Sequence, residues 1–254
     1  MAIAGDGYQY GTAFQRYAAE QAQSSAQAVV PLMIDVLKCR SVLDVGCGNG
    51  MWLRWYRSNG VADILGIDGD YVEPQTLLIP PDRFKAVDIC LPFHLDHRFD
   101  LVQCLEVAEH VPPDASRALI DNLTTHGRHV LFSAAVPGQG GENHLNEHTY
   151  EFWRRLFEER GYVPFDFVRP LLQHRTDVAW WYRYNVLLYV HESAVANLPA
   201  QVFRSRVPAG VPIPDVSPLL FRLRKAILRV TPRGVVSRLA VLRHKLTPIR
   251  YASE

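Results

Sequence analysis

Residues 41–50 read SVLDVGCGNG. The first five form a short apolar run rich in β-branched side chains, which is typical of a buried strand. Gly46, Gly48 and Gly50 follow, and glycines at such a point let the backbone turn tightly and approach a ligand with no Cβ atom in the way. A helix pattern over residues 50–59 begins directly afterwards. The stretch therefore predicts a strand that enters a helix through a ligand-binding turn.

The spacing of these glycines differs from that of a dinucleotide site. The dinucleotide fingerprint is G-x-G-x-x-G, and it places a pyrophosphate at the helix N-terminus. Here the spacing is G-x-G-x-G, and Asp44 stands two residues before the first glycine. A carboxylate at the end of the strand disfavours a phosphate and suits a ligand that carries an ammonium or sulfonium group.

Strand and helix patterns alternate along the chain on both sides of this stretch. Further helix patterns cover residues 18–38, 106–125 and 147–160, and further strand patterns cover residues 62–68, 84–89, 99–105, 129–136, 161–169 and 182–191. This alternation predicts an α/β fold with a doubly wound, mostly parallel seven-stranded sheet. Such sheets bind ligands beyond the carboxyl ends of their strands.

Two more acids stand at predicted strand ends. Asp68 ends the second strand, 18 residues after Gly50, where a carboxylate can accept both hydroxyls of a ribose. Asp88 stands at the end of the third strand pattern, where it can accept from an adenine amino group.

The motifs VLDVGCGNG, LGIDGD and FDLVQCLEVAEHV, in this order and spacing, resemble those of the class I S-adenosylmethionine (SAM)-dependent methyltransferases. The resemblance covers roughly residues 38–170 and implies a Rossmann-like fold. It also implies a set of SAM-binding residues. Asp44, Gly46 and Gly48 would contact the methionine part, Asp68 the ribose and Asp88 the adenine. Leu105 and Glu106 would border the sulfonium.

The sequence E-V-A-E-H that follows the fourth strand suggests a metal site. In the helix expected here, Glu106, Glu109 and His110 would share one face, and three such ligands can hold Mg²⁺ or a similar divalent ion. The pattern resembles the metal ligands of small-RNA 2′-O-methyltransferases and of ubiquinone-pathway O-methyltransferases. The alternative is that this Glu-His pair only caps and packs the helix.

A loop dense in glycine and polar residues, residues 137–148, follows the fifth strand. In this fold the loop would overhang the acceptor pocket, where His144 would act as a general base or complete the metal site begun by the E-V-A-E-H segment. A surface position for His144 is the alternative. Asn146 and Glu147 would cap the helix over 147–160, with His148 in its first turn.

The aromatic segment TDVAWWYRYNVLLYV, residues 176–190, suggests a carbohydrate acceptor because flat aromatic faces stack on sugar rings. An aromatic edge strand that covers the core is the alternative. Together with GGENHLNEHTYEFW, the segment is similar to methyltransferases of glycan and polysaccharide assembly, including the sugar O-methyltransferases of polymethylated-polysaccharide pathways.

Charge divides the chain into two parts. Residues 1–200 hold 16 basic and 24 acidic side chains, whereas residues 201–254 hold 11 basic and 2 acidic ones. We therefore expect a methyltransferase domain over 1–200 and a basic helical extension over 201–254. The extension would pair with the acidic body of its own subunit or of a second one in a homodimer, or contact a membrane surface. RNA is disfavoured, because the basic charge lies away from the motifs.

The composition gives a location and excludes several classes. With 254 residues, 48% of them hydrophobic, the chain is neither disordered nor a disulfide-stapled miniature. Four cysteines without a CxxC pair indicate a reduced, cytoplasmic compartment, and no signal peptide or membrane-spanning run is found.

These observations together predict a SAM-dependent O-methyltransferase that acts on a hydroxyl of a sugar or oligosaccharide. His144 would take the proton, and Mg²⁺ held by Glu106, Glu109 and His110 would steady the oxyanion. The rival hypotheses are O-methylation of a quinone, a phenol or an RNA 2′-hydroxyl, and a SAM-binding module without catalytic activity.

Overall fold

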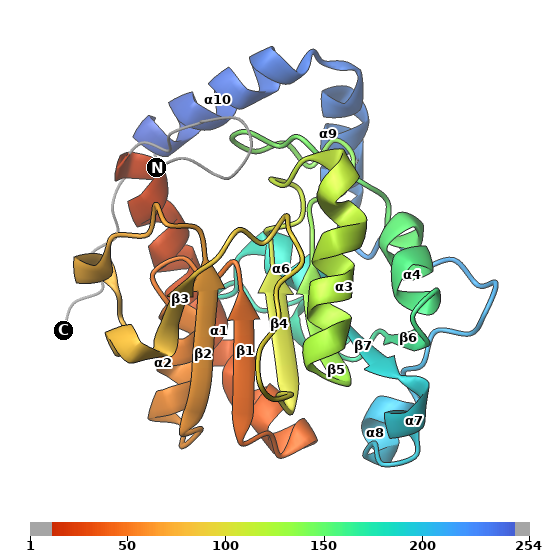
Figure 1. The fold of residues 1–254 in the computed structure, drawn as a ribbon. Helices are drawn as coiled ribbons and strands as arrows, with labels where there is room; N and C mark the ends of the chain where they lie inside the picture. The colour runs from red at the N-terminus through yellow and green to blue at the C-terminus, as the bar shows by residue number, and fades with distance from the viewer. Residues whose placement is uncertain (1–11, 247–254) are drawn as a thin grey trace.

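A computed structural model describes residues 12–246 and contains a seven-stranded sheet in the order β3-β2-β1-β4-β5-β7-β6 (Figure 1). The strands pair in parallel except for β7, which is antiparallel to both of its neighbours. Their bounds are β1 Ser41–Val45, β2 Asp63–Asp68, β3 Phe84–Ala86, β4 Leu101–Leu105, β5 His129–Ser133, β6 Tyr162–Phe165 and β7 Leu187–His191. The predicted α/β fold with a mostly parallel sheet is confirmed.

Helices cover both faces of the sheet, as the alternation of buried side chains along β1 requires. Val42 belongs to one apolar cluster, whereas Leu43 and Val45 belong to the other. The first cluster is covered by α1 Thr12–Leu37, α2 Met51–Ser58, α5 Val168–Leu172 and α6 Trp180–Asn185. The second is covered by α3 Ser116–His126 and α4 Tyr150–Glu158.

Shorter elements connect these layers. They are the single-turn helices η1 Pro74–Thr76, η2 Pro81–Arg83 and η3 Pro113–Ala115, and the short helices α7 Glu192–Val195 and α8 Ala200–Phe203. All four cysteines are free thiols.

The prediction of a helix over residues 106–125 is wrong for the residues before Ser116. Glu106 adopts a left-handed conformation with φ of 56°, and its backbone N–H donates to the carbonyl of Ser133 on β5. Residues 107–110 then form a turn, and α3 begins only at Ser116. Pro112 and Pro113 explain the difference, because a proline inside a helix removes a backbone donor and clashes with the preceding turn. The E-V-A-E-H segment is therefore a loop.

The strand predicted over 182–191 is correct only in its second half. Residues 180–185 form α6, and the sheet ladder begins where Leu187 pairs with Phe132. Because β5 ends at Ser133, which stands opposite Val186 in this register, residues 182–185 have no β5 residue beside them to complete a ladder.

Two C-terminal helices, α9 Leu219–Val230 and α10 Arg233–Leu246, lie beyond the carboxyl ends of the parallel strands (Figure 1). The predicted helical character of the basic segment is thus seen in the part that the structure describes. Among the described residues, no helix is both long and apolar enough to span a bilayer.

Candidate functional site

The glycine turn after β1 is tightly constrained. Gly46, Gly48 and Gly50 all have positive φ angles, of 81°, 55° and 81°. A Cβ atom on Gly46 would lie 2.4 Å from Cγ2 of Val107, so the turn packs directly against the loop that follows β4. A Cβ atom on Gly48, in contrast, would meet no atom within 4 Å. The turn therefore leaves open space at Gly48, where a ligand can approach the backbone.

Asp44 is buried at the end of β1 and pairs in register with Gln103 of β4. Its Oδ2 atom has no hydrogen-bond partner among the described residues. Burial raises the pKa of Asp44 to about 7, against the opposing effect of the Gln103 amide. An unpartnered buried carboxylate oxygen suits a cationic group such as the ammonium of methionine.

Asp68 is buried at the end of β2 and is held by the same turn. Its carboxylate accepts from the backbone N–H of Gly48 at 2.6 Å and of Gly69 at 2.8 Å, and also from the hydroxyl of Tyr71. Burial raises the pKa of Asp68, and these hydrogen bonds oppose the rise. Asp88 differs, because it is exposed beyond the end of β3 and accepts from the backbone N–H of Cys90.

A cavity of about 380 Å³ begins at the end of β4. Its polar wall comes from the loops after β4 and β5, and the aromatic side chains of α6 form a second wall. Helices α9 and α10 form its roof. The lining includes Leu105, Glu106, Glu109, His110, Gln139, Glu142, His144, Trp180, Trp181, Tyr182, Arg224, Leu228, Val236, Leu239 and Ala240.

Three of the predicted metal ligands meet in this cavity. Glu109, His110 and His144 each offer one ligand atom, and these atoms lie within 4.8 Å of one another. Glu109 is buried and its Oε2 atom has no hydrogen-bond partner among the described residues. Burial, followed by the nearby carboxylate of Glu106, raises the pKa of Glu109. Burial, followed by His144, lowers the pKa of His110 to about 3, which keeps its imidazole neutral and able to bind a metal.

Glu106 lies beside this cluster but is not part of it. Its carboxylate accepts from the side-chain amides of Gln139 at 2.9 Å and Asn185 at 3.3 Å. Burial raises the pKa of Glu106, while hydrogen bonds from Ser133 and these two amides oppose the rise. The structure thus replaces the predicted Glu106, Glu109 and His110 helix face with a loop that brings Glu109 and His110 to His144.

His144 is oriented by Glu147. Nδ1 of His144 lies 2.8 Å from Oε1 of Glu147, and the same carboxylate accepts from the backbone N–H groups of Gly138 and Gly140. Although burial acts in the opposite direction, these hydrogen bonds lower the pKa of Glu147, which is therefore ionised at neutral pH. An ionised carboxylate can only accept, so Nδ1 carries the proton and Nε2 keeps its lone pair.

The helix-capping role predicted for Asn146 and Glu147 is wrong. Helix α4 begins at Tyr150 with Thr149 at its N-cap. Asn146 instead donates to the carbonyl of Ala108 and to the hydroxyl of Ser116, and so ties the histidine loop to the loop after β4. His148 precedes the helix and stacks on Phe152.

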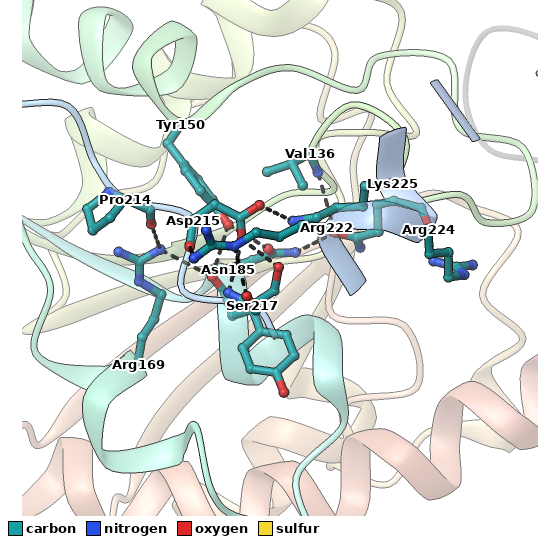
Figure 2. A network of polar contacts seen from close by, with 12 residues as sticks. Val136, Tyr150, Arg169, Asn185, Pro214, Asp215, Ser217, Arg222, Arg224 and Lys225 are labelled. Atoms are coloured by element: carbon teal, nitrogen blue, oxygen red, sulfur yellow. Dashed lines mark hydrogen bonds and ion pairs between the residues drawn. The ribbon is translucent and has the colours of Figure 1, made fainter. Parts of the chain in front are cut away.

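Arg224 connects the roof to the cavity wall. Its Nη1 atom donates to the carbonyl of Gln139 at 2.8 Å, and its guanidinium lies over the ring of Trp180. The same helix is also fixed by Lys225, whose ammonium lies 2.5 Å from the carboxylate of Asp215 (Figure 2). Three residues of the site that the sequence did not single out, Gln139, Asn185 and Arg224, are thus linked in one network.

Comparison with known proteins decides the family. A methyltransferase domain family model matches residues 7–165, more than half of the chain. The chain belongs to this methyltransferase family. Methyltransferases of this family use SAM as the methyl donor, so the chain is a SAM-dependent methyltransferase.

Curated relatives of this methyltransferase include ubiquinone biosynthesis O-methyltransferases. The chain is 34% identical over 118 residues to the one from Alkalilimnicola ehrlichii, a match that covers 41% of the chain and 47% of that relative. The chain thus spans about half the length of this relative.

Two solved structures share the fold of the methyltransferase. A sugar N-methyltransferase from Streptoalloteichus sp ATCC 53650 superposes with a TM-score of 0.53 at 17% identity, over 75% of this chain and 98% of the other. A SAM-bound amino pentose methyltransferase from Micromonospora echinaspora gives 0.52 at 13% identity, over 74% and 99%. At such low sequence identities, the two superpositions support a shared fold and carry no information about the substrate of this chain.

Proposed function

We propose that this methyltransferase transfers the methyl group of SAM to a hydroxyl of a sugar or glycan. The observation that carries the proposal is the oriented pair of His144 and Glu147 in a cavity that begins at Leu105, at the end of β4. A base of this kind serves a hydroxyl, because an alcohol must lose its proton during methylation, whereas a neutral amine can attack first.

His144 acts as the general base. Its Nε2 lone pair takes the hydroxyl proton while the oxygen forms its bond to the methyl carbon and the carbon–sulfur bond breaks. S-adenosylhomocysteine leaves as the neutral product. Glu147 stabilises the imidazolium that results, since an ionised carboxylate favours the protonated form of its histidine partner.

The residues that would bind SAM lie at or just beyond the carboxyl ends of the parallel strands. We propose that the unpartnered Oδ2 of Asp44 receives the ammonium of SAM, and that Gly46 and Gly48 leave room for its methionine part. Asp68 accepts from the ribose hydroxyls and Asp88 from the adenine amino group. The buried side chain of Leu105 borders the sulfonium.

Glu109, His110 and His144 fit a divalent cation, because each offers a ligand atom and Glu109 has an unpartnered oxygen. Two imidazoles with one carboxylate favour a borderline ion such as Mn²⁺, Co²⁺ or Zn²⁺ over Mg²⁺, which prefers oxygen ligands. Mg²⁺ would fit better if Glu106 turned from its amide partners toward Glu109. Because Glu147 holds Nδ1 of His144, a cation would be bound by the Nε2 lone pair, so the base role of His144 belongs to the metal-free enzyme. A bound cation would instead lower the pKa of the acceptor hydroxyl.

The acceptor class rests on the cavity walls. Trp180 and Trp181 present aromatic surface to a sugar ring, while the carboxylate of Glu142 offers a hydrogen-bond acceptor to its hydroxyls. A phenol or a quinol is the second candidate. It is favoured by the aliphatic roof of Leu228, Val236, Leu239 and Ala240 and by the name of the relative from Alkalilimnicola ehrlichii.

An acceptor panel tests the proposal. Formation of S-adenosylhomocysteine is measured with methyl glycosides, oligosaccharides, catechols, a quinol and a short RNA, before and after treatment with EDTA. Turnover of a saccharide with a methyl ether as its product supports the proposal. Turnover of catechols or quinols alone favours the second candidate, and tight SAM binding without turnover of any alcohol contradicts both.

A further inference from the structure

Large apolar side chains are exposed on the two helices that roof the cavity. Of the twelve most exposed large apolar residues within the described part of the chain, eight lie on α9 and α10. They are Leu219, Leu220, Leu223, Ile227, Val230, Val235, Leu239 and Leu242. This concentration is unusual for the outer surface of a protein.

The exposed residues of α9 form a stripe along one side of the helix. Leu220, Leu223, Ile227 and Val230 follow a spacing of three and four residues, so they share one face. Leu223 and Ile227 are each 57% exposed. The opposite side of the helix is used within the molecule, since Leu228 lines the cavity.

The charge around this stripe has a single sign. Residues 216–246 contain eight Lys and Arg side chains and no Asp or Glu. Lys225 is paired with Asp215 and Arg224 contacts Gln139, whereas Arg229 and Arg238 are exposed on the surface. Helices that expose an aliphatic stripe and arginines on the same part of the molecule match an anionic lipid surface, where the apolar face enters the acyl boundary and the cations meet the headgroups.

We propose that α9 and α10 dock the enzyme on an anionic lipid bilayer. A second copy of the chain fits the same helices poorly, because residues 216–246 of both copies carry basic side chains and no acidic ones and would repel each other. Nucleic acid also fits poorly, because it offers nothing for an aliphatic stripe to cover. The docked surface adjoins the acceptor cavity, since Leu239 is 53% exposed and also lines that cavity.

Co-sedimentation of the full chain with vesicles tests the proposal without use of enzymatic activity, so its outcome is independent of the acceptor. Vesicles of phosphatidylcholine with phosphatidylglycerol are compared with vesicles of phosphatidylcholine alone. We expect at least tenfold stronger binding to the anionic vesicles, and weaker binding as salt is raised.

Two double variants separate the apolar and the charged parts. Leu223→Gln with Ile227→Gln should reduce vesicle binding at least tenfold. Arg229→Gln with Arg238→Gln should reduce it roughly 30-fold, since each basic side chain near an anionic surface contributes about a fivefold gain. The matched control is Leu171→Gln with Phe203→Gln, two residues that are each 50% exposed elsewhere, and it should bind like the unmodified chain.

Circular dichroism and thermal unfolding of every variant establish that the fold is retained. The proposal is overturned if the unmodified chain does not bind anionic vesicles, or if the control pair weakens binding as much as the α9 pair. It is also overturned if light scattering shows a dimer that the α9 pair dissociates while vesicle binding is absent.

Discussion

The imidazole of His144 and the carboxylate of Glu147 form a partly buried hydrogen-bonded pair, with 2.8 Å between Nδ1 and Oε1. Glu147 is fixed in turn by the backbone N–H groups of Gly138 and Gly140. The glycine-rich loop thus sets both the position and the tautomer of the histidine that faces the cavity.

Replacing Glu147 by Gln should lower kcat roughly 10- to 100-fold, the range for loss of a carboxylate that orients a histidine. The KM for the acceptor should change much less, because Glu147 does not line the acceptor cavity. Steady-state kinetics measure both constants. Glu73→Gln, at an exposed glutamate outside the cavity lining, is the control and should match the unmodified enzyme. An unchanged kcat in Glu147→Gln would contradict the proposal that Glu147 orients His144.

The affinity for the cofactor should depend on pH through Asp44. With its pKa raised to about 7, Asp44 is increasingly protonated below pH 7 and loses its attraction for an ammonium group. The Kd of S-adenosylhomocysteine should rise about tenfold for each pH unit below 7 and be constant above it. Isothermal titration calorimetry from pH 5.5 to 8.5 measures this. A flat profile would show that Asp44 does not bind the ammonium.

The same carboxylate should destabilise the fold. The folded pKa of Asp44 is higher than its usual value, so stability falls as pH rises between about 4 and 7 and stays reduced above 7. Asp44→Asn should therefore unfold several degrees higher than the unmodified chain at pH 8, while its cofactor binding is weak at every pH. Differential scanning calorimetry tests this, and a lower Tm would contradict it.

Two glycines of one turn should respond differently to alanine. Gly46→Ala places a Cβ atom 2.4 Å from the Val107 side chain, so we expect a loss of about 2 kcal/mol or more in the free energy of unfolding. Gly48→Ala meets no atom and should cost about 1 kcal/mol of backbone strain, yet weaken cofactor binding. Urea denaturation and calorimetry separate the two effects. Val107→Ala should partly restore the stability of Gly46→Ala, and no restoration would argue against the contact.

The affinity of the chain for divalent ions should depend on the metal. After EDTA treatment, Mn²⁺, Co²⁺ and Zn²⁺ should each bind more tightly than Mg²⁺, with one ion per chain. His110→Ala and Glu109→Gln should each remove most of this binding. His174→Ala, at an exposed position away from the cavity, should not. Calorimetry with each metal measures the affinities. If His110→Ala bound the metals as tightly as the unmodified chain, the proposed metal site would be wrong.

Local pattern was sufficient to predict the sheet, the glycine turn and the acids at the strand ends. Asp44 and Asp68 each end a strand whose apolar run is visible in the sequence, and β1 and β2 place them at one edge. The E-V-A-E-H segment was predicted as a helix because its spacing has helical period. Pro112 and Pro113, only two residues further on, carried the contrary signal.

Other parts of the site depend on contacts that no local pattern encodes. Gln139, Asn185 and Arg224 come from three separate segments and meet only in the folded chain. The charge asymmetry revealed a basic C-terminal segment, but charge alone does not say that Leu228 of this segment lines the cavity. The domain boundary at residue 200 stays a prediction.

The loss of methyl transfer in His144 variants tests the central claim most directly. The rate of S-adenosylhomocysteine formation is measured for His144→Ala and His144→Gln with saturating acceptor, and cofactor affinity is measured in parallel. Both variants should bind S-adenosylhomocysteine normally and turn over at least 100-fold more slowly, since general-base assistance contributes about 10²- to 10⁴-fold. Turnover within twofold of the unmodified enzyme would contradict it.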